Sequence, residues 1–244
     1  MKSIFLKELR FFFGSLIGYL VIGAYLILNA LLFWFLETNS NILITQIAEL
    51  DPFFIGSAWL FMFVAPALCM GSFSEEIKSG TVELLFTKPV SLLSIVISKW
   101  LAVLTFVFFA LLPTIINVIA VILLLPDGFD LDLGRILSGY LGLFLTIVTF
   151  CGISLFFSSV FSNQVTVFVT ATLACFIHYF LWGQLAVVSD NNWLYGQLIF
   201  FGLDSHLNYF SGGLIKINSL IYYIIHFALL LYVITQNLKR RMEI

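Results

Sequence analysis

Six apolar stretches constrain this chain of 244 residues more than any other feature, because each is long enough to cross the ~30 Å hydrocarbon core of a bilayer. Lipid offers the backbone no hydrogen-bond partner, so single segments of this length cross it as helices. We therefore expect one all-α polytopic membrane domain over residues 1–244. Its spans cover residues 11–36, 52–73, 92–125, 134–161, 165–187 and 217–238.

The composition agrees with a membrane protein, since 61% of the residues are hydrophobic and only 10% are charged. Pro66 predicts a kink in the second span. The third span is too long for a straight crossing, so it should tilt, and polar residues around Pro113 predict a break in its middle. Glycines in the fourth span predict close helix approach, namely Gly139, Gly142 and Gly152.

Basic residues set the expected orientation. With both termini in the cytoplasm, nine of the eleven Lys and Arg residues face the cytoplasm, and only Arg135 and Lys216 lie outside. Residues 1–10 alternate apolar and polar faces, which predicts an interfacial helix; a disordered basic tip is the alternative. The apolar run that follows is too long for a cleavable signal, so we expect it to be retained.

The longest polar stretch between two spans is GSFSEEIKSGTVELLFTKPVS, residues 71–91. Ser72 and Glu75 have capping-box spacing, and Gly80 can end a first helical turn. An apolar face at i, i+3, i+4 begins at Val82, and Pro89 prevents continuation. We expect residues 74–91 to form an amphipathic helix at the cytoplasmic surface that contacts another protein. A polar loop that only joins two spans is the alternative.

Residues 188–216 precede the last span. Their apolar part, residues 194–203, is too short to cross a bilayer and predicts a re-entrant or interfacial segment. His206 in this segment is a candidate functional residue, although capping of a broken helix explains it as well. His178 and His226 lie within spans and are expected to hydrogen-bond between helices.

Several classes of function are disfavoured. No Asp or Glu falls in the middle of a span, which argues against ion-coupled transport. The chain lacks HExxH and GxxxxGK[ST] motifs, its three cysteines have no metal-binding spacing, and no basic nucleic-acid footprint is present. We expect no catalytic residue, no bound metal and no cofactor in this chain, so energy must come from a partner.

The stretch that begins at Glu75 is similar to the signature EE-x3-GT-x-E-x-L-x-T-x-P-x-S of ABC-2 permeases, the membrane subunits of type-2 ABC transporters. The resemblance implies that it forms a coupling helix, which docks into a groove of a separate ATPase subunit that binds ATP and Mg. The coupling residues would be Glu75, Glu76, Gly80, Thr81, Glu83, Thr87 and Pro89. In the re-entrant segment, the candidate site residues are His206, Tyr209 and Gly212.

Two further stretches resemble a narrower branch, the F-subunit permeases of gliding-motility-associated ABC transporters of Bacteroidota. Residues 12–19 (FFGSLIGY) resemble its FF-x-S-x-x-G/A-Y start. Residues 205–215 resemble its S-x-x-HF-x-x-F-x-x-G-x-I segment, although Leu207 stands where Phe is commoner and Asn208 shifts the pattern. This branch implies the bacterial inner membrane, surrounding lipid, and a second, larger permease with an extracytoplasmic domain.

Two functions remain open beside export. The ATPase could drive a periplasmic partner by mechanotransmission, with no cargo moving through the membrane; a continuous polar path between spans would favour export. The chain could also be a membrane scaffold or assembly protein without ATP coupling.

Overall fold

The computed structural model describes residues 1–36, 49–81, 91–124, 131–189 and 191–242. Every regular element in these ranges is helical. Six helical segments among them are long and apolar enough to cross a membrane, which confirms the all-α fold with six spans. They are Leu16–Phe35, Asp51–Lys78, Leu92–Leu124, Leu133–Val160, Gln164–Val188 and Ile217–Arg241.

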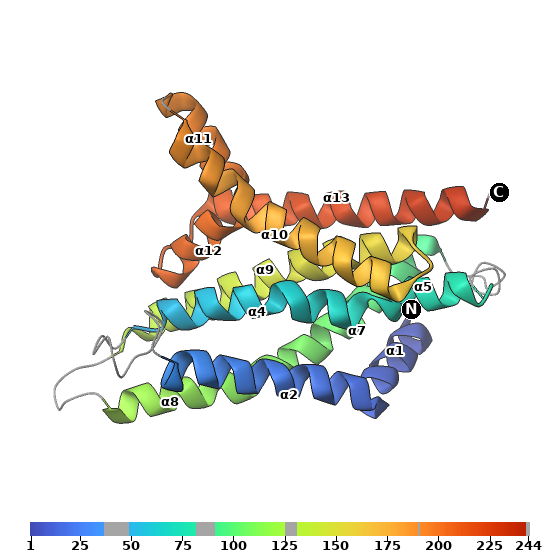
Figure 1. Ribbon diagram of the computed structural model, residues 1–244, viewed down its shortest axis with the longest axis horizontal. Helices are drawn as coiled ribbons and strands as arrows, with labels where there is room; N and C mark the ends of the chain where they lie inside the picture. The colour runs from blue at the N-terminus through green and yellow to red at the C-terminus, as the bar shows by residue number, and fades with distance from the viewer. Residues whose placement is uncertain (37–48, 82–90, 125–130, 190, 243–244) are drawn as a thin grey trace.

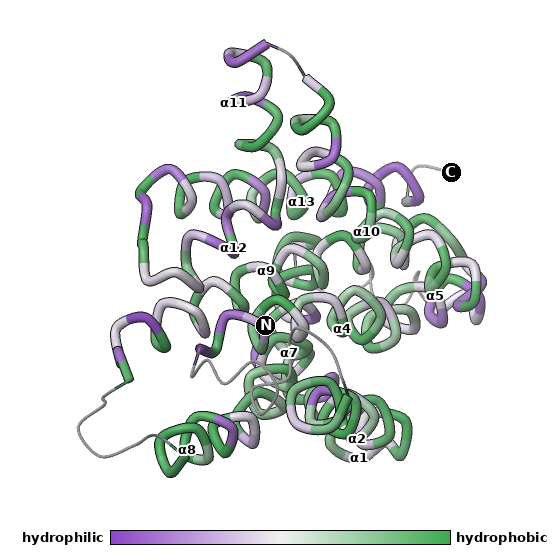
Figure 2. The backbone as a smooth tube through the Cα atoms, turned by 60° about the vertical axis from the view of Figure 1, so that its left-hand side comes forward, coloured by the Kyte–Doolittle hydropathy of each residue, from purple (hydrophilic) through white to green (hydrophobic). Residues whose placement is uncertain are grey.

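The spans run along the long axis of the molecule, and both termini lie at the same end as α5 (Gly71–Lys78) (Figure 1). We call this the termini end. Helix α9 (Leu133–Val160) is the centre of the bundle, because it contacts α4 (Asp51–Cys69), α7 (Leu92–Leu111), α10 (Gln164–Val188) and α13 (Ile217–Met242). Hydrophilic positions gather at α5, at the tip of α11 (Asn192–Phe201) and at the end of α13 (Figure 2).

The first helix, α1, covers Lys2–Gly14 and is longer than expected. Residues 11–14 belong to it and not to the first span, which starts with α2 (Leu16–Ala30) and continues as the π-helix η1 (Leu31–Phe35). The division falls at Ser15, whose backbone is extended and whose hydroxyl accepts a hydrogen bond from Gly18 N at 3.1 Å. The alternative of a disordered N-terminal tip is wrong.

The third span breaks where Pro113 predicts a break. It consists of α7, the 3-10 turn η2 (Leu112–Thr114) and α8 (Ile115–Leu124). Proline has no N–H for the helical ladder, and in the same turn the Thr114 hydroxyl donates to Leu111 O, 2.6 Å away. Beyond the break α8 lies at the edge of the bundle, and only Val118 and Val121 of its residues are buried.

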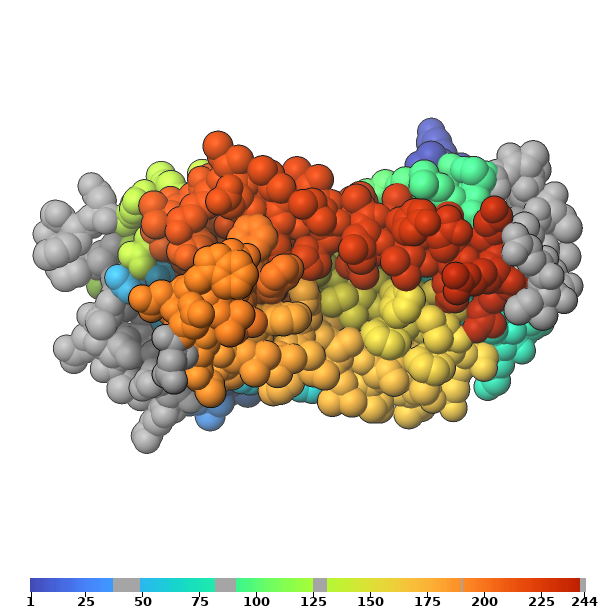
Figure 3. Space-filling view, turned by 90° about the horizontal axis from the view of Figure 1, so that it is seen from above, coloured from blue at the N-terminus to red at the C-terminus, as the bar shows by residue number. Residues whose placement is uncertain are grey.

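The C-terminal part forms one face of the molecule, over which α10, α11 and α13 spread (Figure 3). Helices α9 and α10 make the expected tight hairpin, in which Asn163 caps α10. Residues 188–216 contain two short helices, α11 against α10 and α12 (Leu203–Ser211) against α9. Re-entry of this segment into the membrane stays a prediction.

The glycines of α9 allow large side chains to approach its backbone, as predicted. A Cβ atom would lie 2.2 Å from the Phe54 ring at Gly139, 2.3 Å from Phe210 Cβ at Gly142, and 2.4 Å from the Trp100 ring at Gly152. Three aromatic residues on α4, α12 and α7 therefore pack directly on the central helix.

We predict that Gly142→Ala destabilises the protein by about 1–3 kcal/mol, because the new methyl group overlaps Phe210 in a closely packed interior. Thermal unfolding of the purified protein in mild detergent measures the effect. Gly56→Ala is the matched control, since nothing lies within 4 Å of its added Cβ and alanine favours a helix. Equal melting temperatures for the two variants would contradict the packing role of Gly142.

Candidate functional site at the termini end

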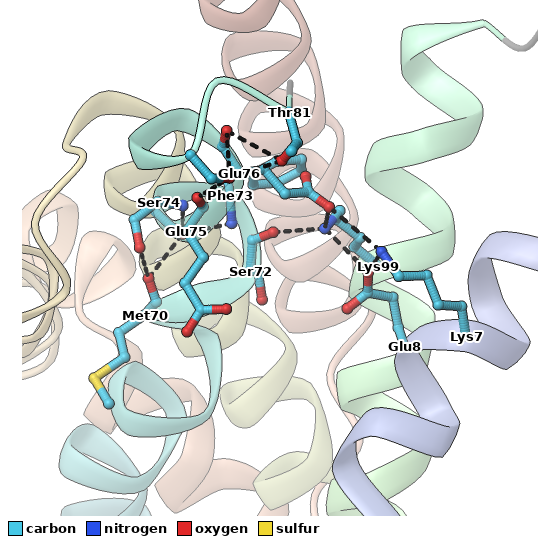
Figure 4. A network of polar contacts seen from close by, with 12 residues as sticks. Lys7, Glu8, Met70, Ser72, Phe73, Ser74, Glu75, Glu76, Thr81 and Lys99 are labelled. Atoms are coloured by element: carbon cyan, nitrogen blue, oxygen red, sulfur yellow. Dashed lines mark hydrogen bonds and ion pairs between the residues drawn. The ribbon is translucent and has the colours of Figure 1, made fainter. Parts of the chain in front are cut away.

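A buried lysine is the main polar feature of the termini end. Lys99 lies in the second turn of α7 and is only 2% exposed. A buried ammonium group is costly unless it is paired and hydrogen-bonded. Its Nζ atom lies 3.1 Å from Glu8 Oε1 on α1 and 2.9 Å from Glu76 Oε1 on α5. Helices α1, α5 and α7 therefore meet at one ammonium group (Figure 4).

All three N–H donors of the Lys99 ammonium group have an acceptor. An ammonium group has three N–H donors, and the carbonyl oxygen of Ser72 accepts the third. The Phe73 ring centroid lies 5.0 Å from Nζ, within the range of a cation–π contact. Lys7, which is largely exposed, lies 3.9 Å from both carboxylates. We call Lys7, Glu8, Glu76 and Lys99 the Lys99 cluster; its two acids and two bases balance.

Packing along α1 and α7 holds Glu8 in place. Phe12, one turn after Glu8 on the same face, stacks on Phe106 of α7 with ring centroids 5.3 Å apart. Glu8 and Phe12 are the buried residues of α1. The amphipathic helix thus buries its acid against Lys99 and leaves Lys2, Lys7 and Arg10 exposed.

Helix α5 is also bonded to α9 and α10. It follows α4 after a break at Met70, where Ser158 of α9 enters the helical hydrogen-bond ladder. The Ser158 hydroxyl accepts from Phe73 N at 3.0 Å and from Ser74 N at 3.2 Å, and donates to Met70 O at 3.1 Å. An inserted side chain of this kind is a recognised cause of helix kinks.

The two neighbouring glutamates of α5 face different ways. Glu75 is exposed, and its Oε1 accepts from Gln164 Nε2, 2.5 Å away at the start of α10. The Glu76 carboxylate turns inward to Lys99, so a direct contact between Glu76 and a partner stays a prediction that this geometry does not favour. A cavity of about 170 Å³ lies beside both side chains and reaches Ser15, the N-cap of α2.

Of the remaining coupling residues, Gly80 and Thr81 belong to the described part of the chain. Gly80 has φ 71°, the left-handed conformation that ends a helix, as predicted. Thr81 is exposed and its hydroxyl lies 2.8 Å from that of Ser79. Glu83, Thr87 and Pro89, together with the expected apolar face from Val82, lie outside the described residues.

One expectation for this stretch is wrong. Ser72 and Glu75 form no capping box, because α5 restarts after a single residue and its Phe73 and Ser74 amides bond to Ser158; Ser72 is buried. Residues 71–78 continue the helical segment of the second span to Lys78. An amphipathic surface helix over residues 74–91 stays a prediction, since residues 82–90 lie outside the described residues.

Sequence reasoning missed Lys99 and Glu8. The available signal was the position of Lys99, the eighth residue of the predicted third span, where a basic residue inside the membrane requires an acidic partner. Glu8 is the acid of the helix that packs on α7.

A second polar group surrounds Tyr222 in the half of the molecule away from α5. His206 is buried, donates Nε2–H to Phe200 O, and lies 2.8 Å from the Ser219 hydroxyl. Burial lowers the pKa of His206, so the neutral ring is favoured. The His206 nitrogen that does not face Ser219, Nε2, contacts a backbone carbonyl and not a carboxylate, and Ser219 is 1% exposed. The pair of His206 and Ser219 therefore lacks the geometry of a hydrolytic triad.

All three histidines contact Tyr222, which the sequence did not reveal. His178 Nε2 lies 3.2 Å from the Tyr222 hydroxyl and joins α10 to α13, as predicted. The expectation for His226 is wrong, because its Nδ1 donates to Tyr222 O within the same helix. Among the other candidate residues of the re-entrant segment, Tyr209 makes a cation–π contact, with Lys216 Nζ 3.2 Å from its ring centroid. Gly212 follows the last residue of α12.

The fold and the Lys99 cluster define the class: a multi-pass helical membrane protein whose charged contacts join several spans at one end. Residues 13–235 match the family of ABC-2 family transporter proteins, so the chain belongs to that family. It is therefore a permease component of an ABC transporter, a membrane subunit that is not itself catalytic and that works with an ABC ATPase. No curated protein matched the chain.

We predict that Lys99→Met lowers the free energy of unfolding by about 3–5 kcal/mol, because two carboxylates lose the buried cation that pairs them. Thermal unfolding in mild detergent is the measurement. Lys7→Met is the matched control; its ammonium group is exposed and 3.9 Å from each acid, so we expect a loss below about 1 kcal/mol. A stability loss no larger for Lys99→Met than for Lys7→Met would contradict the central role of Lys99.

Proposed function

We propose that this chain couples ATP hydrolysis on a separate ATPase subunit to export or mechanotransmission across the inner membrane of a bacterium. The ATPase subunit holds ATP and Mg, and the termini end faces the cytoplasm. The asymmetry of basic residues supports this orientation, since eight of the eleven belong to described segments at that end. The stretches around residues 12–19 and 205–215 support a role in gliding motility.

The observation that best supports coupling is the set of polar contacts around α5. Glu76 bonds to Lys99 of α7, and the same lysine holds Glu8 of α1. Glu75 bonds to α10, and two amides of α5 bond to Ser158 of α9. A displacement of α5 therefore acts on four neighbouring helices through bonds with defined geometry.

The exposed residues of α5 and the turn after it form the proposed docking surface. Glu75, Lys78 and Thr81 are exposed, whereas Glu76 maintains the Lys99 cluster. We assign ATPase contact to Glu75 and internal transmission to Glu76. Glu83, Thr87 and Pro89 extend this surface in our proposal.

A second permease completes the proposed assembly. Six spans are half of the usual two-fold bundle, and α2, α8 and α10 expose many large apolar side chains to lipid or to a partner chain. The segments of this chain that join its spans are too short for an extracytoplasmic domain, so that domain would belong to the partner.

We predict that Glu75→Lys abolishes co-purification of the ATPase from native membranes, because it reverses the charge of the exposed docking residue. The tagged chain is isolated in mild detergent, and the eluate is assayed for ATP hydrolysis. Gln164→Leu is the matched control: it removes the same hydrogen bond to Glu75 from the α10 side and leaves the carboxylate in place. We expect the ATPase to remain with this variant.

Equal loss of the ATPase with both variants would show that the hydrogen bond matters and that Glu75 does not dock. An unmodified chain that never co-purifies with an ATPase would overturn the coupling function and leave a membrane scaffold.

A further inference from the structure

An apolar groove opens at the membrane face of the bundle, in the half away from the termini end. It exists because α8 follows the break at Pro113 and diverges from α9. Its volume is about 500 Å³, and α7, α8 and α9 line it. The lining includes Phe108, Leu112, Ile115, Leu137, Leu141 and Phe144.

A polar cavity of about 230 Å³ adjoins this groove. Glu49, Asp51, Asp132 and Arg135 line it, and Ile136 lines both hollows, so the two are neighbours on either side of that side chain. We call the two hollows together the combined space; one end is charged and the other is apolar.

The charged end offers both hydrogen-bond donors and a hydrogen-bond acceptor that have no partner among the described residues. Arg135 has five N–H donors, and three of them bond to described residues: Asp51 Oδ2 at 2.6 Å, Glu49 Oε1 at 3.3 Å and Ser211 O at 3.2 Å. The other two donors have no acceptor among the described residues, so they can bind an anion. Asp51 Oδ1 is buried and has no hydrogen-bond partner among the described residues, so it lacks a donor.

The depth of the site in the membrane follows from the length of α9. At about 1.5 Å per residue, its 28 residues extend about 42 Å, close to the ~40–45 Å of a bilayer with headgroups. Arg135 is the third residue of this helix and thus lies at headgroup depth. The groove residues from Leu137 to Phe144 lie at the depth of the acyl chains.

We propose that this combined space binds one membrane phospholipid with a primary-amine headgroup. One acyl chain fills the groove, the phosphate accepts hydrogen bonds from Arg135, and the ammonium group donates to Asp51 Oδ1. Three acids around one arginine favour a head with a cation beside its phosphate. A choline head lacks N–H donors for Asp51, and a glycerol head lacks the cation. The site is independent of ATP coupling.

The test measures lipid retention by the purified full-length chain. The protein is incubated in mild detergent with phosphatidylethanolamine, phosphatidylcholine or phosphatidylglycerol of identical chains, and bound lipid is counted by native mass spectrometry. We expect one retained phosphatidylethanolamine and weaker retention of the other two lipids.

Leu137→Trp fills the groove and should reduce phosphatidylethanolamine retention about tenfold, since a few methylene contacts are lost. Leu133→Trp is the matched control, one turn earlier on α9, similarly exposed and absent from the groove lining; it should retain the lipid. Ile115→Trp fills the groove from the α8 wall and replaces Leu137→Trp if that variant misfolds.

Unchanged retention when the groove is filled would overturn the proposal. Equal retention of phosphatidylethanolamine and phosphatidylcholine would also overturn it, because the ammonium contact to Asp51 would then contribute nothing.

Discussion

The pairing of one buried ammonium group with two carboxylates determines how the termini end of this protein is built. Lys99 is only 2% exposed, so its charged ammonium group requires both acids close to it. One acid comes from the N-terminal helix α1 and the other from α5. The electrostatic requirement of a single side chain therefore ties α1 and α5 to the third span, in addition to the packing of Phe12 on Phe106 and the hydrogen bonds of α5 to Ser158.

Much of the fold was predictable because its causes are local to the sequence. The lengths of the apolar stretches predicted the six spans, Pro113 predicted the break between α7 and α8, and Gly80 predicted the left-handed residue after α5. The glycines of α9 indicated close packing, although not which aromatic residues approach them. Ser15 could have revealed the late start of the first span, since an N-cap serine divides α1 from α2.

The site was less predictable because its contacts join residues far apart in the chain. Nothing near Glu8 in the sequence indicates Lys99, and nothing near Met70 indicates Ser158. The same is true of the three histidines, which converge on Tyr222 from α10, α12 and α13. Glu75 and Glu76 show most clearly what the sequence does not reveal. The two look equivalent in sequence, yet Glu75 is exposed and Glu76 binds the buried Lys99.

The two charged clusters lie at opposite ends of the same pair of helices. Helix α4 starts at Asp51, which pairs with Arg135 near the start of α9, and it leads into α5, whose amides bond to Ser158 near the end of α9. Between these ends Phe54 packs on Gly139 without space for a methyl group. Close-packed interiors deform little, so we expect the pair to move as one body. We would then expect a displacement at α5 to reach Arg135 as a rotation or shift of the whole pair, and not as a local rearrangement that fades along the span.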